Sequence, residues 1–332
     1  MIGPDGLARH ATQLRSMSRA LVLGSGGLTG IAWEAGVLAA LADAGFDVTS
    51  WDLVVGSSAG AFVGARMLAD GSAEPLARAQ EAVVVAQLEA DFGVFAGPWP
   101  LRFIRASRRR RLGWLQGAAI VPLAIRAALA NARRDGLAEL GVVPAVIRSR
   151  RAGSDPAAGL RALGRLARAN AAPEDAWVRF WEDRLTPVAA WSEGRLLITA
   201  IDVASGERLA IDGSSGGSLA RAVAASTALA GLLPPIAIAG RPCIDGGSGS
   251  PTNADLAAGH SQVLVVAPMD RGVLARETDG LRAAGARVDH IQPSEASTVM
   301  LGRELGRLDP ARIAASVRAG RADGTAAAGR LG

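Results

Sequence analysis

Lysine and tyrosine are absent from this 332-residue sequence, and cysteine occurs once, as Cys243. All 36 basic residues are therefore arginines, which we interpret as a coding bias rather than a functional selection. A single cysteine excludes an internal disulfide bond and a cysteine-based metal site, and it fits a reducing compartment. We accordingly expect neither a metal ion nor a cofactor.

Long apolar runs are lacking as well. The longest weakly charged stretch, residues 112–125, contains a glutamine and a proline and is followed by an arginine. A membrane-spanning helix needs about 20 apolar residues. Residues 1–19 have no apolar segment of the kind found in a signal peptide. We therefore expect a soluble protein in the cytoplasm, with peripheral attachment to a membrane as the alternative location.

Charge is distributed unevenly along the chain. Residues 98–170 contain 15 arginines and three acidic residues, whereas the net charge of the whole chain is only +5. The excess indicates either a solvated surface or peripheral binding to anionic lipid, where each nearby cation contributes about 1 kcal/mol. Binding of nucleic acid is not expected, because no known binding motif accompanies the arginines. The residues most typical of a membrane contact are Arg108, Arg109, Arg110 and Arg111.

Short apolar runs that end at glycines predict a parallel sheet. Strands are expected at residues 20–23 and 52–55, each followed by a helix, at 31–44 and 58–69. This strand–helix–strand–helix order, with right-handed crossovers, begins an α/β fold. Later strands are expected at residues 196–202, 208–211, 236–239, 243–244, 263–267 and 288–291, with a helix at 219–225.

The order of these elements divides the chain into three parts. Residues 1–18 form a flexible N-terminal segment, and residues 19–293 form the α/β domain. A helical, basic insert occupies about residues 74–183 of that domain. Residues 294–332 form a helical C-terminal segment, which we expect to fray into an Ala/Gly-rich tail after Ala319.

The first motif of chemical interest follows the first strand, at residues 24–30 (GSGGLTG). Glycines in such a loop allow close approach of a ligand, and N–H groups at a helix start favour negative charge. The motif also suggests a dinucleotide site. That reading is weaker, because the spacing is irregular and no acidic residue stands where the ribose would need one.

The second motif, residues 56–60 (GSSAG), has the pattern G-x-S-x-G between a strand and a helix. In this context the serine occupies a strained turn, and side chains at the flanking glycines would clash. The following helix directs its N-terminus at the site and stabilises an anion. Ser58 is therefore the candidate nucleophile.

The third motif, residues 244–247 (IDGG), puts a carboxylate after a short apolar run. Asp-Gly is common in turns, so a turn is the simplest interpretation; the functional alternative is a base held against Ser58. Asn253, a few residues later, is interpreted as a helix N-cap.

Together the three motifs resemble those of the patatin-like phospholipase family, in the same order, over residues 19–267. The resemblance implies a three-layer α/β/α fold with a mostly parallel central sheet and a helical insertion. It also implies a Ser–Asp dyad without histidine that cleaves lipid esters through an acyl-enzyme, as a phospholipase A or lysophospholipase does. The implied residues are Ser58 as nucleophile, Asp245 as general base, Gly26, Gly27 and Leu28 at the oxyanion hole, Gly56 and Gly60 at the elbow, and Gly246 and Gly247 in the aspartate loop.

Two alternatives stay open. The first is a Ser–Asp–His esterase, because His260 and His290 follow Asp245 in the order of α/β-hydrolases; His10 lies in the N-terminal segment. The second is a membrane-associating protein with a degenerate hydrolase core and no activity. One departure from the family pattern concerns residues 226–231, where Ala230 stands in place of a frequent proline.

Overall fold

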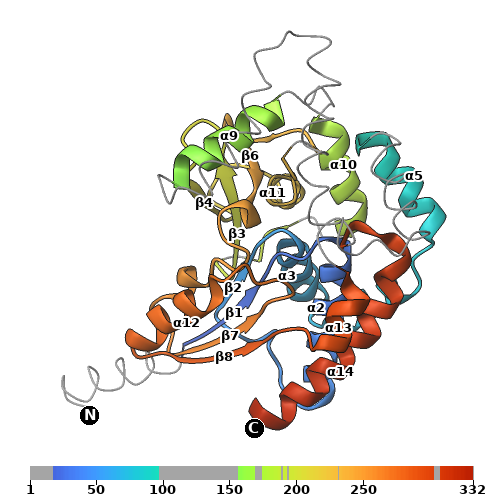
Figure 1. Cartoon of the computed structure of the whole chain (residues 1–332), viewed down its shortest axis with the longest axis vertical. Coiled ribbons are helices and arrows are strands. Elements are labelled where there is room, and N and C mark those ends of the chain that lie inside the picture. Colours follow the sequence, from blue (N-terminus) through green and yellow to red (C-terminus); the bar gives the residue numbers. More distant parts are fainter. Residues whose placement is uncertain are drawn as a thin grey trace, which may run out of the picture.

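The computed structural model describes residues 18–96, 156–168, 174–187, 190–192, 194–230, 232–302 and 307–331. A mixed sheet lies at its centre, with the strand order β5-β6-β3-β2-β1-β7-β8 and β4 paired to β3 (Figure 1). The strands are β1 (Arg19–Leu23), β2 (Leu53–Gly56), β3 (Leu196–Asp202), β4 (Arg208–Ile211), β5 (Ile236–Ile238), β6 (Arg241–Asp245), β7 (Gln262–Val266) and β8 (Arg287–Ile291).

The five strands β3, β2, β1, β7 and β8 run parallel, and β4, β5 and β6 join antiparallel to their neighbours. In a parallel sheet the carboxyl ends of the strands share one edge, where ligands bind at a switch in strand order. The antiparallel β6 ends at Asp245, which pairs with Ala200 on β3. The fold is therefore the α/β/α type with a mostly parallel sheet that the sequence predicted.

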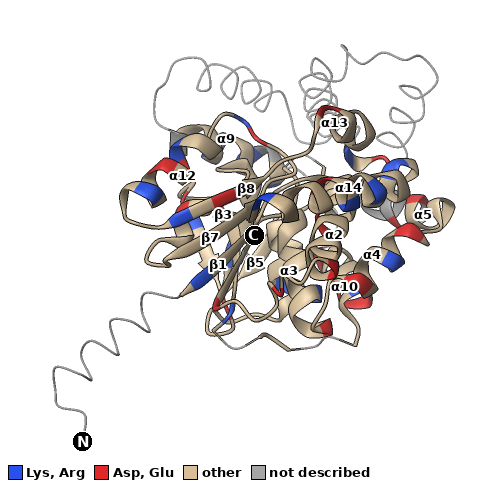
Figure 2. Ribbon diagram, turned by 90° about the horizontal axis from the view of Figure 1, so that it is seen from below, with Lys and Arg blue, Asp and Glu red and all other residues tan. Residues whose placement is uncertain are grey.

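Each face of the sheet packs against its own apolar core. Along β1, Leu21 and Leu23 belong to the larger core, whereas Ala20 and Val22 belong to the smaller one, as the two-residue repeat of a strand requires. Charged residues lie mainly on the outer helices, and the inner strands are largely uncharged (Figure 2).

Helices cover both faces and complete the three layers. On the larger core lie α2 (Gly27–Asp43), α3 (Ala59–Asp70), α10 (Glu174–Leu185), α11 (Leu219–Ser226) and α14 (Ile313–Leu331). On the smaller core lie α12 (Leu274–Ala283) and the 3-10 helix η3 (Ala254–Ala257). The helices α4 (Glu74–Glu81), α5 (Val85–Ala96) and α13 (Glu295–Leu301) also contribute buried residues to the larger core. The remaining helical segments are α9 (Pro156–Arg168), η2 (Gly246–Ser248) and η5 (Pro310–Arg312).

The C-terminal segment differs from the prediction, because α14 continues through Leu331 and does not fray after Ala319. It packs directly on α2. A Cβ atom added to Gly320 would lie 2.1 Å from the carbonyl oxygen of Trp33, so the two helix backbones touch at this point. The indole Nε1 of Trp33 also donates to Asp323, at 2.8 Å. The small residues of α14 therefore allow the two helices to pack closely, and this segment is not a loose tail.

Other predictions fall partly or wholly outside the described residues. Four helices occupy the ends of the predicted insert, but residues 97–155, with Arg108–Arg111, lie outside, as do residues 1–17. Within the described part of the chain, no helix is both long and apolar enough to cross a membrane.

Candidate active site

Ser58 lies between the end of β2 and the start of α3, in a backbone conformation that few residues adopt. Its φ of 54° and ψ of −110° fall in the left-handed half of the map, where a Cβ atom is unfavourable. The turn is also crowded. A Cβ atom at Gly60 would lie 2.2 Å from the carbonyl oxygen of Leu23, and one at Gly56 would lie 2.6 Å from Cα of Ala61. These contacts explain why glycines flank the serine.

The side chains of Ser58 and Asp245 meet although 187 residues separate them. Ser58 Oγ donates to Asp245 Oδ2 at 3.0 Å, and both residues are buried. The other carboxylate oxygen, Oδ1, accepts a hydrogen bond of 2.6 Å from the amide of Gly247. The Asp-Gly-Gly turn thus orients the carboxylate, because one oxygen is held by the loop and the other faces the serine.

Burial changes the chemistry of this carboxylate. Removal from water raises the pKa of Asp245 from 3.8 to about 6, against the smaller opposing effects of the Gly247 amide, the Ser58 hydroxyl and the charge of Arg271. A carboxylate with this pKa is a stronger base than an exposed aspartate, and it is still ionised at neutral pH. The site therefore holds a serine hydroxyl next to a base of raised basicity.

The glycine loop lies at the same site. Gly26 is the N-cap of α2, and Gly27, with a φ of 65°, and Leu28 form the first turn. Amides in the first turn of a helix have no acceptor within that helix. Gly26, Gly27 and Leu28 line one cavity together with Ser58 and Asp245. The arrangement suits stabilisation of negative charge that develops beside the serine.

The cavity has a volume of about 150 Å³ and is mainly apolar. Two tryptophans of α10, Trp177 and Trp181, form part of its wall, and both are buried. Arg271 lies at the same cavity and donates to the carbonyl of Gly247 at 3.3 Å. The other apolar lining residues are Ile31, Ala59, Leu229, Leu232, Leu233, Met269 and Leu308.

A family model described as patatin-like phospholipase matches residues 21–258, which span the glycine loop, the elbow and the aspartate loop. The chain belongs to the patatin-like phospholipase family. No curated protein sequence matches it.

Two solved structures resemble this patatin-like chain. The type III effector protein ExoU shares 17% identity at a TM-score of 0.40, over 95% of this chain and 53% of that one. VipD from Legionella pneumophila shares 14% identity at a TM-score of 0.34, over 90% of this chain and 67% of that one. The chain thus spans about half the length of the ExoU chain.

One partner of the nucleophile was not predicted. The amide of Ser58 donates to Ser226 Oγ at 2.9 Å, at the C-terminal end of α11. Ser226 begins the stretch that lacks the family's frequent proline, and Thr227 and Leu229 of the same stretch line the cavity. No local pattern in the sequence marks this serine, because its role depends on contact with a residue 168 positions away.

The two described histidines of this patatin-like chain do not reach the dyad. His260 lies in a turn, with Nδ1 3.1 Å from the carbonyl of Ala257, and His290 is exposed on β8. Neither lines the cavity. His10 lies outside the described residues. Within the described part of the chain, no group of three or more histidine, cysteine, aspartate or glutamate side chains is arranged to hold a metal ion.

Proposed function

We propose that this protein hydrolyses carboxylic esters of lipids through a Ser58–Asp245 dyad and an acyl-enzyme. The observation that carries the proposal is the 3.0 Å hydrogen bond from Ser58 Oγ to Asp245 inside an apolar cavity. Membership of the patatin-like phospholipase family supports lipid esters as the substrate class.

In the first half-reaction, Asp245 takes the hydroxyl proton as Ser58 Oγ bonds to the acyl carbon. The carbonyl π bond breaks, and the negative charge on its oxygen is held by amides of the Gly26–Leu28 turn. The ester bond then breaks, and the alcohol leaves with the proton from Asp245. In the second half, Asp245 takes a proton from water as the water oxygen bonds to the acyl carbon. The bond between the acyl carbon and Ser58 Oγ then breaks, the proton passes from Asp245 to Ser58 Oγ, and the fatty acid leaves.

The apolar wall suits the acyl side of the substrate. A cavity of this volume accommodates an apolar group about the size of benzene. The carbonyl end and the first carbons of an acyl chain fit this space, with the lining tryptophans and leucines replacing water around them. Phospholipase A or lysophospholipase activity is the form of the reaction that we propose. Peripheral membrane attachment through Arg108–Arg111 stays a prediction, because these arginines lie outside the described residues.

A fluorophosphonate probe tests the nucleophile directly. We expect the wild-type protein to be labelled and to hydrolyse acyl esters, and Ser58→Ala to do neither. Ser261→Ala is the matched control, since it removes a serine hydroxyl bonded to the carbonyl of Ser18 at the opposite end of the sheet. Equal labelling of Ser58→Ala and the wild type would reject the mechanism. An unlabelled, inactive wild type would instead favour the non-catalytic alternative.

A further inference from the structure

The residue before the nucleophile is held by a polar cluster of its own. Ser57 is fully buried and does not line the cavity. Its Oγ lies 2.8 Å from Thr199 Oγ1 and accepts a hydrogen bond from Asn253 Nδ2, also at 2.8 Å. Through Ser57, the strained turn at Ser58 is therefore hydrogen-bonded to two other parts of the chain, at Thr199 and at Asn253.

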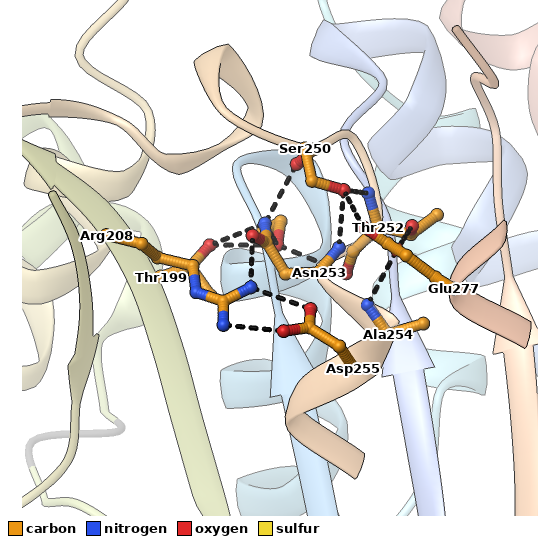
Figure 3. A network of polar contacts seen from close by, with 9 residues as sticks. Thr199, Arg208, Ser250, Thr252, Asn253, Ala254, Asp255 and Glu277 are labelled. Carbon is orange, nitrogen blue, oxygen red and sulfur yellow. Dashed lines mark hydrogen bonds and ion pairs between the residues drawn. The ribbon is translucent and has the colours of Figure 1, made fainter. Parts of the chain in front are cut away.

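Asn253 is the centre of this cluster (Figure 3). Its Oδ1 accepts from Arg208 Nη1 at 3.2 Å, and a guanidinium group can only donate. The amide nitrogen must then face the other way. There it lies 2.8 Å from the carbonyl of Ser250 and 3.3 Å from Thr199 Oγ1, besides its bond to Ser57. The orientation of the amide is thus determined by its surroundings.

The groups around Asn253 are themselves held in place. Arg208 forms two hydrogen bonds of 2.7 Å with the carboxylate of Asp255. From the other side, Glu277 on α12 accepts from Ser250 Oγ at 2.6 Å and from the amide of Ala254 at 3.0 Å. The turn that carries Asn253 is therefore anchored to both β4 and α12.

This turn belongs to the same loop as the general base of the proposed mechanism. The loop leaves β6 at Asp245 and reaches Asn253 eight residues later. Beside this loop, Thr199 on β3 packs closely against Gly246. A Cβ atom added to Gly246 would lie 2.3 Å from Thr199 Oγ1. One amide group thus joins the elbow, the central strand and the aspartate loop.

Asn253 is the N-cap residue of η3, as the sequence predicted, but its side chain forms no cap hydrogen bond. Its backbone adopts the left-handed conformation, with φ 52° and ψ 36°, which asparagine tolerates better than most residues. The side chain is consequently free to reach Ser57.

We propose that Asn253 is a positioning residue, which sets the distance between Ser58 and Asp245 by bonding the elbow to the aspartate loop through Ser57 and Thr199. This inference rests on the proposed function. Loss of the amide removes a link that restrains the strained turn. The turn then relaxes and the serine spends less time within hydrogen-bond reach of its base, which slows acylation without weakening substrate binding.

The test compares Asn253→Gly, Ser57→Ala and the double variant with the wild type. Glycine keeps the left-handed backbone accessible, so the change isolates the side chain. We expect each single variant to lower kcat and the rate of fluorophosphonate labelling about tenfold with KM unchanged, the size of one lost buried hydrogen bond. The double variant should be no slower than the slower single variant, because both changes remove the same link.

Two controls separate positioning from simple loss of stability. Ser261→Ala removes a serine hydrogen bond far from the site and should leave kcat unchanged. Asn253→Asp keeps the shape of the side chain and the bond from Arg208 but cannot donate, so an intermediate rate is expected. All rates are normalised to the amount of folded protein, which is measured by thermal unfolding. If Asn253→Gly does not fold, Asn253→Asp takes its place in the comparison.

Unchanged kcat in the folded Asn253 and Ser57 variants, or a double variant whose loss equals the product of the two single losses, overturns the inference while leaving the proposed function intact. A wild type that neither hydrolyses esters nor reacts with the probe overturns both.

Discussion

Ser57 and Ser58 are neighbours in the chain, but their side chains lie in surroundings of opposite kind. Ser58 faces a largely apolar cavity, where its hydroxyl is bonded to one carboxylate. Ser57 faces a cluster in which hydroxyl, amide and charged groups bond to one another. The nearby carboxylates reflect the same contrast. Burial raises the pKa of Asp245, whereas Arg208 lowers the pKa of Asp255.

The contrast shows how a single turn can hold both a reactive nucleophile and a restrained, strained backbone. A nucleophile and its base gain reactivity when few polar groups compete for them, because charges interact more strongly where water is excluded. A strained backbone, however, needs many bonds to keep its shape. Two adjacent residues meet these two requirements separately. The hydrogen bonds of Ser57 restrain the backbone of the turn, and the hydroxyl of Ser58 stays bonded to Asp245.

The largest effect on the cavity side should come from Asp245→Asn. The variant keeps the shape of the side chain but removes the base, so we expect ester turnover to fall by about 10²–10⁴-fold. Its thermal stability should rise, because the buried charge is lost. Near-normal turnover would show that another group accepts the proton.

Asp202→Asn is the matched control for stability. This aspartate is also buried, but its pKa is lowered by bonds from the Ser205 amide, Arg241 and the Ala204 amide, against the opposing effect of burial. Its charged form is therefore the stable one. Loss of that charge should lower the melting temperature, opposite in sign to the effect at Asp245.

The pH dependence of turnover should follow Asp245. Only the ionised carboxylate accepts the proton of Ser58, so kcat/KM should fall tenfold for each pH unit below about 6. Stability should change in the opposite direction. Because the pKa of Asp245 is higher in the folded than in the unfolded state, the free energy of unfolding of the protein should fall as pH rises from 3.8 to about 6. A rate profile flat down to pH 4.5 would contradict this role.

A smaller effect is expected at Glu34, a second buried carboxyl group, on α2. Neither of its oxygens has a hydrogen-bond partner among the described residues. Burial raises its pKa well above 4.5, and the nearby amide of Gly24, which donates to Val266, offsets this only in part. The folded protein therefore loses stability as pH rises from 4.5 through the raised pKa.

Glu34→Gln removes this titration. We expect its melting temperature to exceed that of the wild type by a few degrees at pH 7–8 and to match it near pH 4. Turnover should stay within about twofold, because Glu34 does not line the cavity. The reading is wrong if the difference in melting temperature does not change with pH.

Much of the fold was predictable because buried strands have a clear pattern. The strands β3 and β4 have the predicted bounds, and β1, β2, β7 and β8 differ by about one residue at their ends. The helix α12 was not predicted, and α14 was expected to fray. Its many alanines and glycines give little amphipathic signal, and only contact with α2 explains their small size.

The candidate site was predictable where its residues sit in local motifs. Ser58, Asp245 and the glycine loop were found in this way, and the structure brings all three to one cavity. Their catalytic roles stay predictions until the variants are measured. Ser226 and Asn253 were missed or assigned another role, because their partners are 168 and 196 residues distant in the chain. Hydrogen bonds between residues so far apart in the chain leave no periodic pattern in the sequence.

The packing of α14 on α2 also has a consequence for how the chain acquires activity. The glycine loop opens α2, and the helix that covers α2 is made about 290 residues later, as the bond from Trp33 to Asp323 shows. Until that segment has left the ribosome, α2 lacks the partner against which its backbone packs. The face of α2 that α14 covers therefore stays without its partner through most of synthesis, whereas α3 and α4, which also pack on α2, are already made.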